Sequence, residues 1–119
     1  MTFLCYPKCS TCKKAKTFLE SNAQSYEMRD ISLENPTVEE LRTWQMWSGL
    51  PLRKFFNTSG LKYRELSLKD RLPTMREEEQ LTLLASDGML VKRPILLHDS
   101  QVLIGFREDT WREALLSNA

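Results

Sequence analysis

Residues 3–20 read FLCYPKCSTCKKAKTFLE, and the rest of the chain is organised around this stretch. The apolar run over residues 2–6 predicts a buried strand, and the helical spacing of apolar residues after it predicts a helix over residues 10–22. Cys9 and Cys12 stand at the junction of the two elements. A thiol at the start of a helix faces unpaired backbone N–H groups, which stabilise a thiolate. The stretch therefore predicts a strand–helix unit with a chemically active C-x-x-C motif.

The two cysteines of this motif have different predicted roles. Cys9 is nearer the helix N-terminus, and Lys8, Lys13 and Lys14 add positive charge around it, so we expect its pKa to fall below the ordinary thiol value. Cys12 lies one turn farther along the helix, where it can attack a mixed disulfide formed by Cys9. Cys9 is therefore the predicted nucleophile and Cys12 the predicted resolving thiol.

Length, charge and cysteine content limit the class of protein. The chain has 119 residues, which predicts a single domain with its own core. Its 17 basic and 16 acidic residues nearly balance, so no charge excess predicts binding to nucleic acid or to a membrane surface. No apolar stretch approaches the ~18 residues that span a bilayer, and no signal-peptide pattern is present. With three cysteines and no disulfide framework, we expect a cytoplasmic protein.

The order of elements predicts a mixed sheet. Residues 25–31 alternate like a second strand, and the helix before them makes a connection long enough for a parallel pair. Residues 94–97 and 102–105 predict a hairpin, and residues 108–116 a last helix. Between these parts lies a helical insertion at about residues 36–88. The resulting order, β-α-β, helical insertion, β-β-α, predicts an α/β fold of the thioredoxin-like kind with a mixed four-stranded sheet.

The insertion has its own start and stop signals. Thr37 and Glu40 form a capping-box pattern for its first helix. Asp87-Gly88 is predicted to end its last helix. Further helices are predicted over residues 63–68 and 75–85.

Two motifs carry a resemblance to a known family. Residues 6–15, YPKCSTCKKA, and residues 91–95, VKRPI, are similar to the arsenate reductase/Spx family, as is the insertion between the second and third strands. The resemblance covers essentially the whole chain, and implies a thioredoxin-like fold, a cytoplasmic location and thiol redox chemistry. In that plan a proline, here Pro94, begins the third strand opposite the C-x-x-C motif, and its preceding peptide bond is often cis. Arg93, just before it, is expected to face the cysteines, where a guanidinium stabilises a thiolate or a bound anion.

The same resemblance bears on arsenate as a substrate. The arsenate reductases of the family hold the oxyanion with three arginines near one catalytic cysteine. Arg93 matches one of them, whereas Asn57 and Phe106 stand near the other two positions, with Arg107 adjacent to Phe106. A multiply charged anion requires several fixed donors. We therefore expect weak or absent arsenate reduction.

The predicted function is a thiol–disulfide oxidoreductase. The predicted catalytic residues are Cys9, Cys12 and Arg93. The predicted substrate-binding residues are Lys8, Ser10, Thr11 and Pro94. No metal and no organic cofactor is required, electrons come from thioredoxin or a low-molecular-weight thiol, and a monomer is expected. A zinc site needs four ligands and is not expected, because only Cys5 and His98 remain as soft candidates beside the pair, and Cys5 is predicted to be a small core residue.

An alternative stays open at this point. The Spx branch of the family also has the C-x-x-C motif, and its members regulate transcription by binding the α-subunit of RNA polymerase. The resemblance therefore also allows a redox-sensing regulator, in which a Cys9–Cys12 bridge switches a protein interface. A purely structural adaptor is a third, weaker hypothesis.

Overall fold

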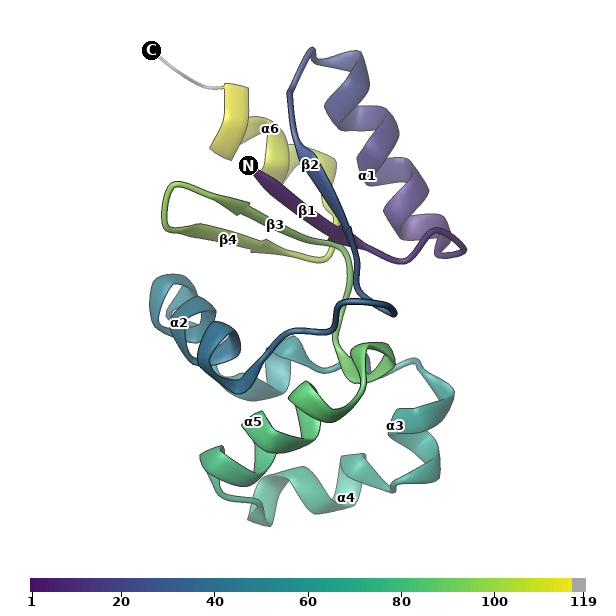
Figure 1. Ribbon diagram of the computed structural model, residues 1–119, viewed down its shortest axis with the longest axis vertical. Coiled ribbons are helices and arrows are strands. Elements are labelled where there is room, and N and C mark those ends of the chain that lie inside the picture. The colour runs from purple at the N-terminus through teal and green to yellow at the C-terminus, as the bar shows by residue number, and fades with distance from the viewer. Residues whose placement is uncertain (117–119) are drawn as a thin grey trace.

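The computed structural model describes residues 1–116 as a four-stranded mixed sheet with helices on both faces (Figure 1). Strand β1 (Thr2–Cys5) pairs in parallel with β2 (Glu27–Asp30) and antiparallel with β3 (Ile95–His98). Strand β4 (Gln101–Ile104) pairs antiparallel with β3 and completes the order β2-β1-β3-β4. The predicted thioredoxin-like sheet is confirmed.

Helices α1 and α6 lie on one side of the sheet, and the insertion from α2 to α5 lies on the other (Figure 1). The α-helices are α1 (Ser10–Ser21), α2 (Val38–Ser48), α3 (Leu61–Glu65), α4 (Leu68–Arg71), α5 (Glu77–Ser86) and α6 (Glu108–Leu116). Three 3-10 helices accompany them: η1 (Leu52–Phe55), η2 (Leu72–Thr74) and η3 (Gly88–Leu90). None of the helices within residues 1–116 is long and apolar enough to cross a membrane.

Strand β1 separates two hydrophobic cores. Successive side chains of a strand point to opposite faces of the sheet. Phe3 and Cys5 pack with α1 and with Trp111 of α6. Leu4 packs on the other face with the insertion, including Trp44 of α2. Cys5 is only 1% exposed, so the prediction that it is a core residue is confirmed.

The insertion departs from the predicted helix boundaries at two places. The predicted helix over residues 63–68 is two short helices, α3 and α4, because the backbone at Ser67 is left-handed, with φ of 52°. The predicted helix over residues 75–85 begins at Glu77, since the N–H of Arg76 donates to Oε1 of Glu79 at 3.0 Å and caps the first turn. Both differences reflect local backbone geometry that apolar spacing does not report.

An ion pair ties the sheet to the start of the insertion. Glu40 closes the predicted capping box with Thr37, and its carboxylate also accepts two hydrogen bonds from the guanidinium of Arg29 on β2, at 2.8 and 2.9 Å. Arg29 further donates to the carbonyls of Glu34 and Asn35. The guanidinium thereby joins β2, the following loop and α2.

Glu40→Gln is expected to lower the free energy of unfolding by about 1–2 kcal/mol at pH 7. Hydrogen bonds from Arg29 hold the pKa of Glu40 below its usual range. The stabilisation is therefore present above the pKa of an unfolded glutamate, about 4.3, and is lost as the pH falls through the lower folded pKa. Urea denaturation at a series of pH values would measure the effect. The exposed neighbour Glu39→Gln is the control, and equal losses in both variants would contradict the prediction.

Candidate active site

The loop after β1 delivers Cys9 to the start of α1. The N–H of Cys9 donates to the carbonyl of Tyr6 at 2.9 Å, and the carbonyl of Cys9 accepts from the N–H of Lys13 at 3.1 Å. Cys9 is thus the residue that caps α1, and helix formation starts at Ser10 as predicted. This geometry leaves the first N–H groups of the helix free to face the Cys9 sulfur.

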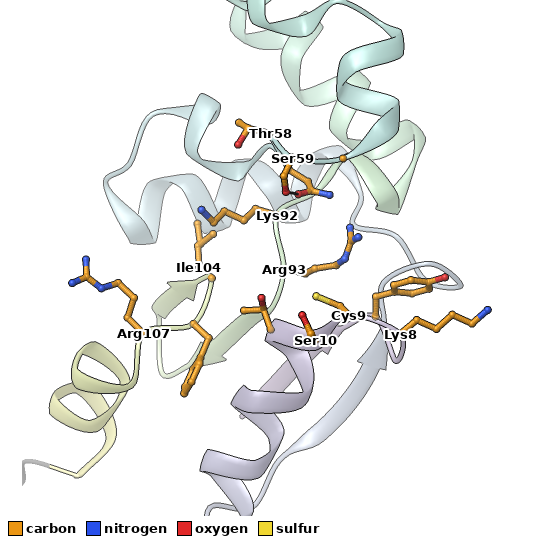
Figure 2. Close-up of a pocket in the computed structure, with 15 residues that line it drawn as sticks. Lys8, Cys9, Ser10, Thr58, Ser59, Lys92, Arg93, Ile104 and Arg107 are labelled. Carbon is orange, nitrogen blue, oxygen red and sulfur yellow. Dashed lines mark hydrogen bonds between the residues drawn. The ribbon is translucent and has the colours of Figure 1, made fainter.

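Cys9 opens onto a pocket of about 620 Å³ (Figure 2). The pocket lies between the loop after β1, the segment after η1, the segment before β3 and the end of β4. Its lining residues are Tyr6, Lys8, Cys9, Ser10, Thr11, Asn57, Thr58, Ser59, Gly60, Lys92, Arg93, Ile104, Gly105, Phe106 and Arg107. A cavity of this size suits a small molecule.

The structure brings most of the predicted site residues together at this pocket. Lys8, Cys9 and Arg93 line it, as do both residues between the cysteines. Cys12 is buried, 2% exposed, and contacts Cys9 through its side chain. Pro94 is buried and is not among the lining residues. The Arg93–Pro94 peptide bond is cis, and the Pro94 carbonyl accepts a hydrogen bond from the N–H of Gly105 at 2.8 Å.

The surroundings of Cys9 favour its thiolate. Partial burial alone would raise the pKa of Cys9. The N–H and thiol of Cys12, the N–H of Thr11 and the charge of Arg93 outweigh that effect and hold the pKa below the ordinary thiol value. The direction matches the prediction, and so does the part that Arg93 plays in it. Arg93 acts on Cys9, whereas Lys13 and Lys14 are exposed on α1.

Cys12 behaves in the opposite way. Burial raises the pKa of Cys12 to about 12, although the N–H of Tyr6 donates to its sulfur at 3.4 Å. Its hydrogen bond to Cys9 and the negative charge on Cys9 raise it further. The pair therefore consists of one ionisable thiol and one thiol that keeps its proton. Cys5 lies behind them, and burial raises its pKa as well.

Arg93 is held beside Cys9 by three weak contacts. Its Nη1 donates to the carbonyls of Met89 and Val91, each at 3.4 Å. Its guanidinium carbon lies 5.3 Å from the centre of the Tyr6 ring, which is within the range of a cation–π contact. Its Nε is buried and has no hydrogen-bond partner among the described residues. The acceptors of the described residues therefore leave the hydrogen-bonding capacity of Arg93 incompletely used.

The site contains no cluster of metal ligands. Within residues 1–116, no three His, Cys, Asp or Glu side chains gather in a way that could hold a metal ion.

Comparison with known proteins places this geometry in a family. The profile of the ArsC family matches residues 4–114, which include the C-x-x-C motif, the insertion and the Arg93–Pro94 segment. The chain belongs to the ArsC family. A protein named YusI from Bacillus subtilis (strain 168) is 52% identical over 113 residues, which are 95% of this chain and 96% of YusI.

A solved structure and a regulator extend the comparison. The crystal structure of an ArsC-family-related protein from Bacteroides fragilis is 54% identical, superposes with a TM-score of 0.91 and covers 94% of both chains. The global transcriptional regulator Spx of Staphylococcus epidermidis (strain RP62A) is 27% identical over 116 residues, which are 97% of this chain and 86% of Spx. This ArsC family protein thus has an ArsC-family-related structure and the regulator Spx among its relatives.

The two positions that were compared with oxyanion-binding arginines in the sequence also lie in this pocket. Asn57 and Phe106 both line it, and the Phe106 ring packs against Trp111, with centroids 5.0 Å apart. Arg107 lines the pocket beside Phe106, but its side chain is 80% exposed and its Nε lies 3.9 Å from Oδ1 of Asp109. Arg93 is thus the lining arginine that the fold holds against Cys9 in this ArsC family protein.

Sequence reasoning missed part of the pocket. Lys92 was not predicted to be a site residue, although it precedes Arg93 in the motif that carries the resemblance. Thr58 and Ser59 come from a turn in the insertion, and nothing in their local sequence indicates the pocket. The adjacency of Lys92 to Arg93 is the one signal that could have found a further member.

Proposed function

We propose that this protein is a thiol–disulfide oxidoreductase in which Cys9 attacks the substrate and Cys12 resolves the intermediate. The observation that carries the proposal is the Cys9 sulfur at the start of α1. It faces the N–H groups of Thr11 and Cys12 and the charge of Arg93, and it contacts the Cys12 thiol. A stabilised thiolate in a pocket with a second thiol in contact is the arrangement that disulfide exchange requires.

The reaction takes place in two exchange steps. The Cys9 thiolate attacks one sulfur of a substrate disulfide, forms a mixed disulfide and releases the other half as a thiolate. Cys12 then loses its proton and attacks the Cys9 sulfur, which forms the Cys9–Cys12 disulfide and releases the second half. The two products take up the proton of Cys12 and one from water. Two electrons pass from the protein to the substrate, and thioredoxin or a low-molecular-weight thiol returns them.

The coupling between the two sulfurs sets the order of the steps. The negative charge on Cys9 and the hydrogen bond to it help to keep Cys12 protonated. When Cys9 enters a mixed disulfide, that charge is removed, so the pKa of Cys12 falls at the moment when its thiolate is needed. Lys8, Arg93 and the amides of residues 10–12 stabilise the departing thiolate, and Pro94 shapes the substrate side of the site through its backbone.

Mild oxidation and a reductase assay test the proposal. Mass spectrometry of the oxidised protein should find an intramolecular Cys9–Cys12 disulfide, and the reduced protein should reduce a small disulfide when coupled to thioredoxin or glutathione. Arsenate, assayed in parallel, should be turned over weakly or not at all. A dominant bridge to Cys5, or saturable arsenate turnover that Arg93→Ala abolishes, would contradict the proposal.

Arg93→Gln is expected to raise the pKa of Cys9, because the variant removes the positive charge beside the thiolate. The rate of alkylation by iodoacetamide, followed against pH, would report that pKa. Tyr6→Leu should have a smaller effect in the same direction, since it removes the ring under the guanidinium, and Tyr6→Phe should restore the wild-type profile. Lys54→Gln, an exposed residue of η1 outside the pocket, is the control.

A second candidate function is a redox-sensing regulator that binds RNA polymerase. The Spx relatives favour it. So do Met46 and Trp47 in the last turn of α2, which are 74% and 42% exposed, because exposed large apolar side chains are common at protein interfaces. Polymerase that co-purifies with the protein, with an affinity that changes on forming the Cys9–Cys12 disulfide, would favour this function over turnover.

A further inference from the structure

We propose that the substrate is a small disulfide that carries a carboxylate, held by Lys92 and Arg107 on the side of the pocket away from Cys9. The inference rests on the proposed function and names the substrate class of the same site. It follows from the distribution of charge in the pocket, the position of Lys92 and the unpaired donor of Arg93.

The pocket concentrates positive charge in a nearly neutral chain. Its lining includes Lys8, Lys92, Arg93 and Arg107 and no aspartate or glutamate, whereas the whole chain has 17 basic and 16 acidic residues. The start of α1 adds the positive end of a helix. Such a site attracts anions and repels cations.

The cations form two groups. Figure 2 shows Lys8, Cys9 and Arg93 on one side of the pocket and Lys92, Ile104 and Arg107 on the other. In the first group, Arg93 acts on the Cys9 thiolate, whereas the Lys8 side chain extends away from Cys9 (Figure 2). In the second group, the Nε of Arg107 lies 3.9 Å from Oδ1 of the exposed Asp109, which does not line the pocket. Within residues 1–116 no carboxylate lies at ion-pair distance from Lys92.

Lys92 is guided toward the pocket by its neighbours. Its N–H donates to the carbonyl of Phe55 at 2.8 Å, which fixes the backbone before β3. Its Cε would lie 3.0 Å from a Cβ placed on Gly105, so the side chain lies across the glycine at the end of β4. A Cβ at position 105 would require the end of the Lys92 side chain to shift by a few tenths of an ångström. The fold therefore leaves room for this lysine.

Arg93 adds an independent observation. Its Nε is buried without a hydrogen-bond partner among the described residues, while the residue lines the pocket. Buried donors of native proteins are nearly always paired, so the protein's own acceptors leave this guanidinium, which lines the pocket, incompletely satisfied. Lys92 and Arg107 would hold the carboxylate of such a disulfide. Its sulfur atoms would then lie toward Cys9, and its other polar atoms would lie along the pocket near Arg93.

Three disulfides of matched length test the charge requirement. They are 3,3′-dithiodipropionate, bis(2-hydroxyethyl) disulfide and cystamine, which carry two negative, no and two positive charges. For each disulfide, the rate constant with which it oxidises the reduced protein is measured. This value is divided by the rate constant with which the same disulfide oxidises dithiothreitol. We expect the dianion to react about tenfold faster than the neutral compound, with cystamine slowest. High salt should reduce these differences.

Variants test whether Lys92 and Arg107 cause the preference for the dianion. Lys92→Gln and Arg107→Gln should each lower the ratio of dianion to neutral rate about three- to tenfold, since each removes a partly exposed charge-assisted contact. Lys54→Gln should leave that ratio unchanged. Suberate, which has the same chain length without the disulfide, should slow alkylation of Cys9 by iodoacetamide in the wild type and less so in Lys92→Gln.

The outcomes separate two kinds of failure. If none of the three disulfides oxidises Cys9, the proposed function is wrong and this inference falls with it. If all three react at the same normalised rate, or if Lys92→Gln keeps the full preference for the dianion, the proposed function stands and the inference alone is overturned.

Discussion

Cys9→Ser is expected to lower the rate of disulfide reduction by at least about 10³-fold, because a serine hydroxyl does not ionise at neutral pH and cannot form the mixed disulfide. The unfolding midpoint should stay close to that of the wild type. Steady-state reduction of bis(2-hydroxyethyl) disulfide would measure the loss. Cys5→Ala is the matched control, since it removes a thiol that lies in the core. Substantial activity in Cys9→Ser, or its loss in Cys5→Ala, would show that the nucleophile has been misassigned.

Cys12→Ser should separate the two chemical steps. The variant keeps the Cys9 nucleophile, so the first exchange still takes place, but no thiol is present to release the mixed disulfide. Adducts should therefore accumulate on Cys9 in cells and can be identified by mass spectrometry. Small thiols or reductase substrates on Cys9 would favour turnover. RNA polymerase recovered equally with and without the trap would favour the regulator.

Gly88→Ala is expected to destabilise the protein by about 3–5 kcal/mol, which is a large share of the stability of a small domain. A Cβ at this position would lie 1.9 Å from the carbonyl oxygen of Ile31, a backbone atom that cannot move without displacing the chain after β2. The insertion approaches the sheet here more closely than any side chain allows. Urea denaturation followed by tryptophan fluorescence would measure the loss.

Gly49→Ala supplies the comparison for this effect. Gly49 ends α2 with φ of 68°, and nothing lies within 4 Å of the position of its Cβ. Alanine there should cost about 1 kcal/mol, from backbone strain alone. If the two alanine variants were destabilised equally, close packing at Gly88 would not be the cause.

Local sequence was enough to predict the parts of the molecule that depend on near neighbours. The start of α1 at Ser10, the capping box at Thr37 and the bounds of α6 follow from spacing and capping residues within one or two helical turns. The role of Gly88 does not. Asp87-Gly88 was predicted to end the last helix of the insertion, and α5 does end at Ser86 with Asp87 as its C-cap. The sequence did not show that Gly88 begins η3 and lies against Ile31. A contact with a residue distant in sequence leaves no local pattern.

The candidate site also has features that local sequence predicts and features that depend on tertiary contacts. The sequence by itself determined that Cys9 would start a helix with Cys12 one turn away, and that its pKa would be lowered, because helix N–H groups belong to the same segment. The resemblance already pointed to Arg93, but only the tertiary structure decided which other cations line the pocket. The pairing of β1 with β3 brings Arg93 to Cys9, and the end of β4 and the insertion complete a cationic pocket with Lys92 and Arg107. Side chains from four separate segments converge only after the sheet has formed, because strand pairing, and not local propensity, sets the distances between them.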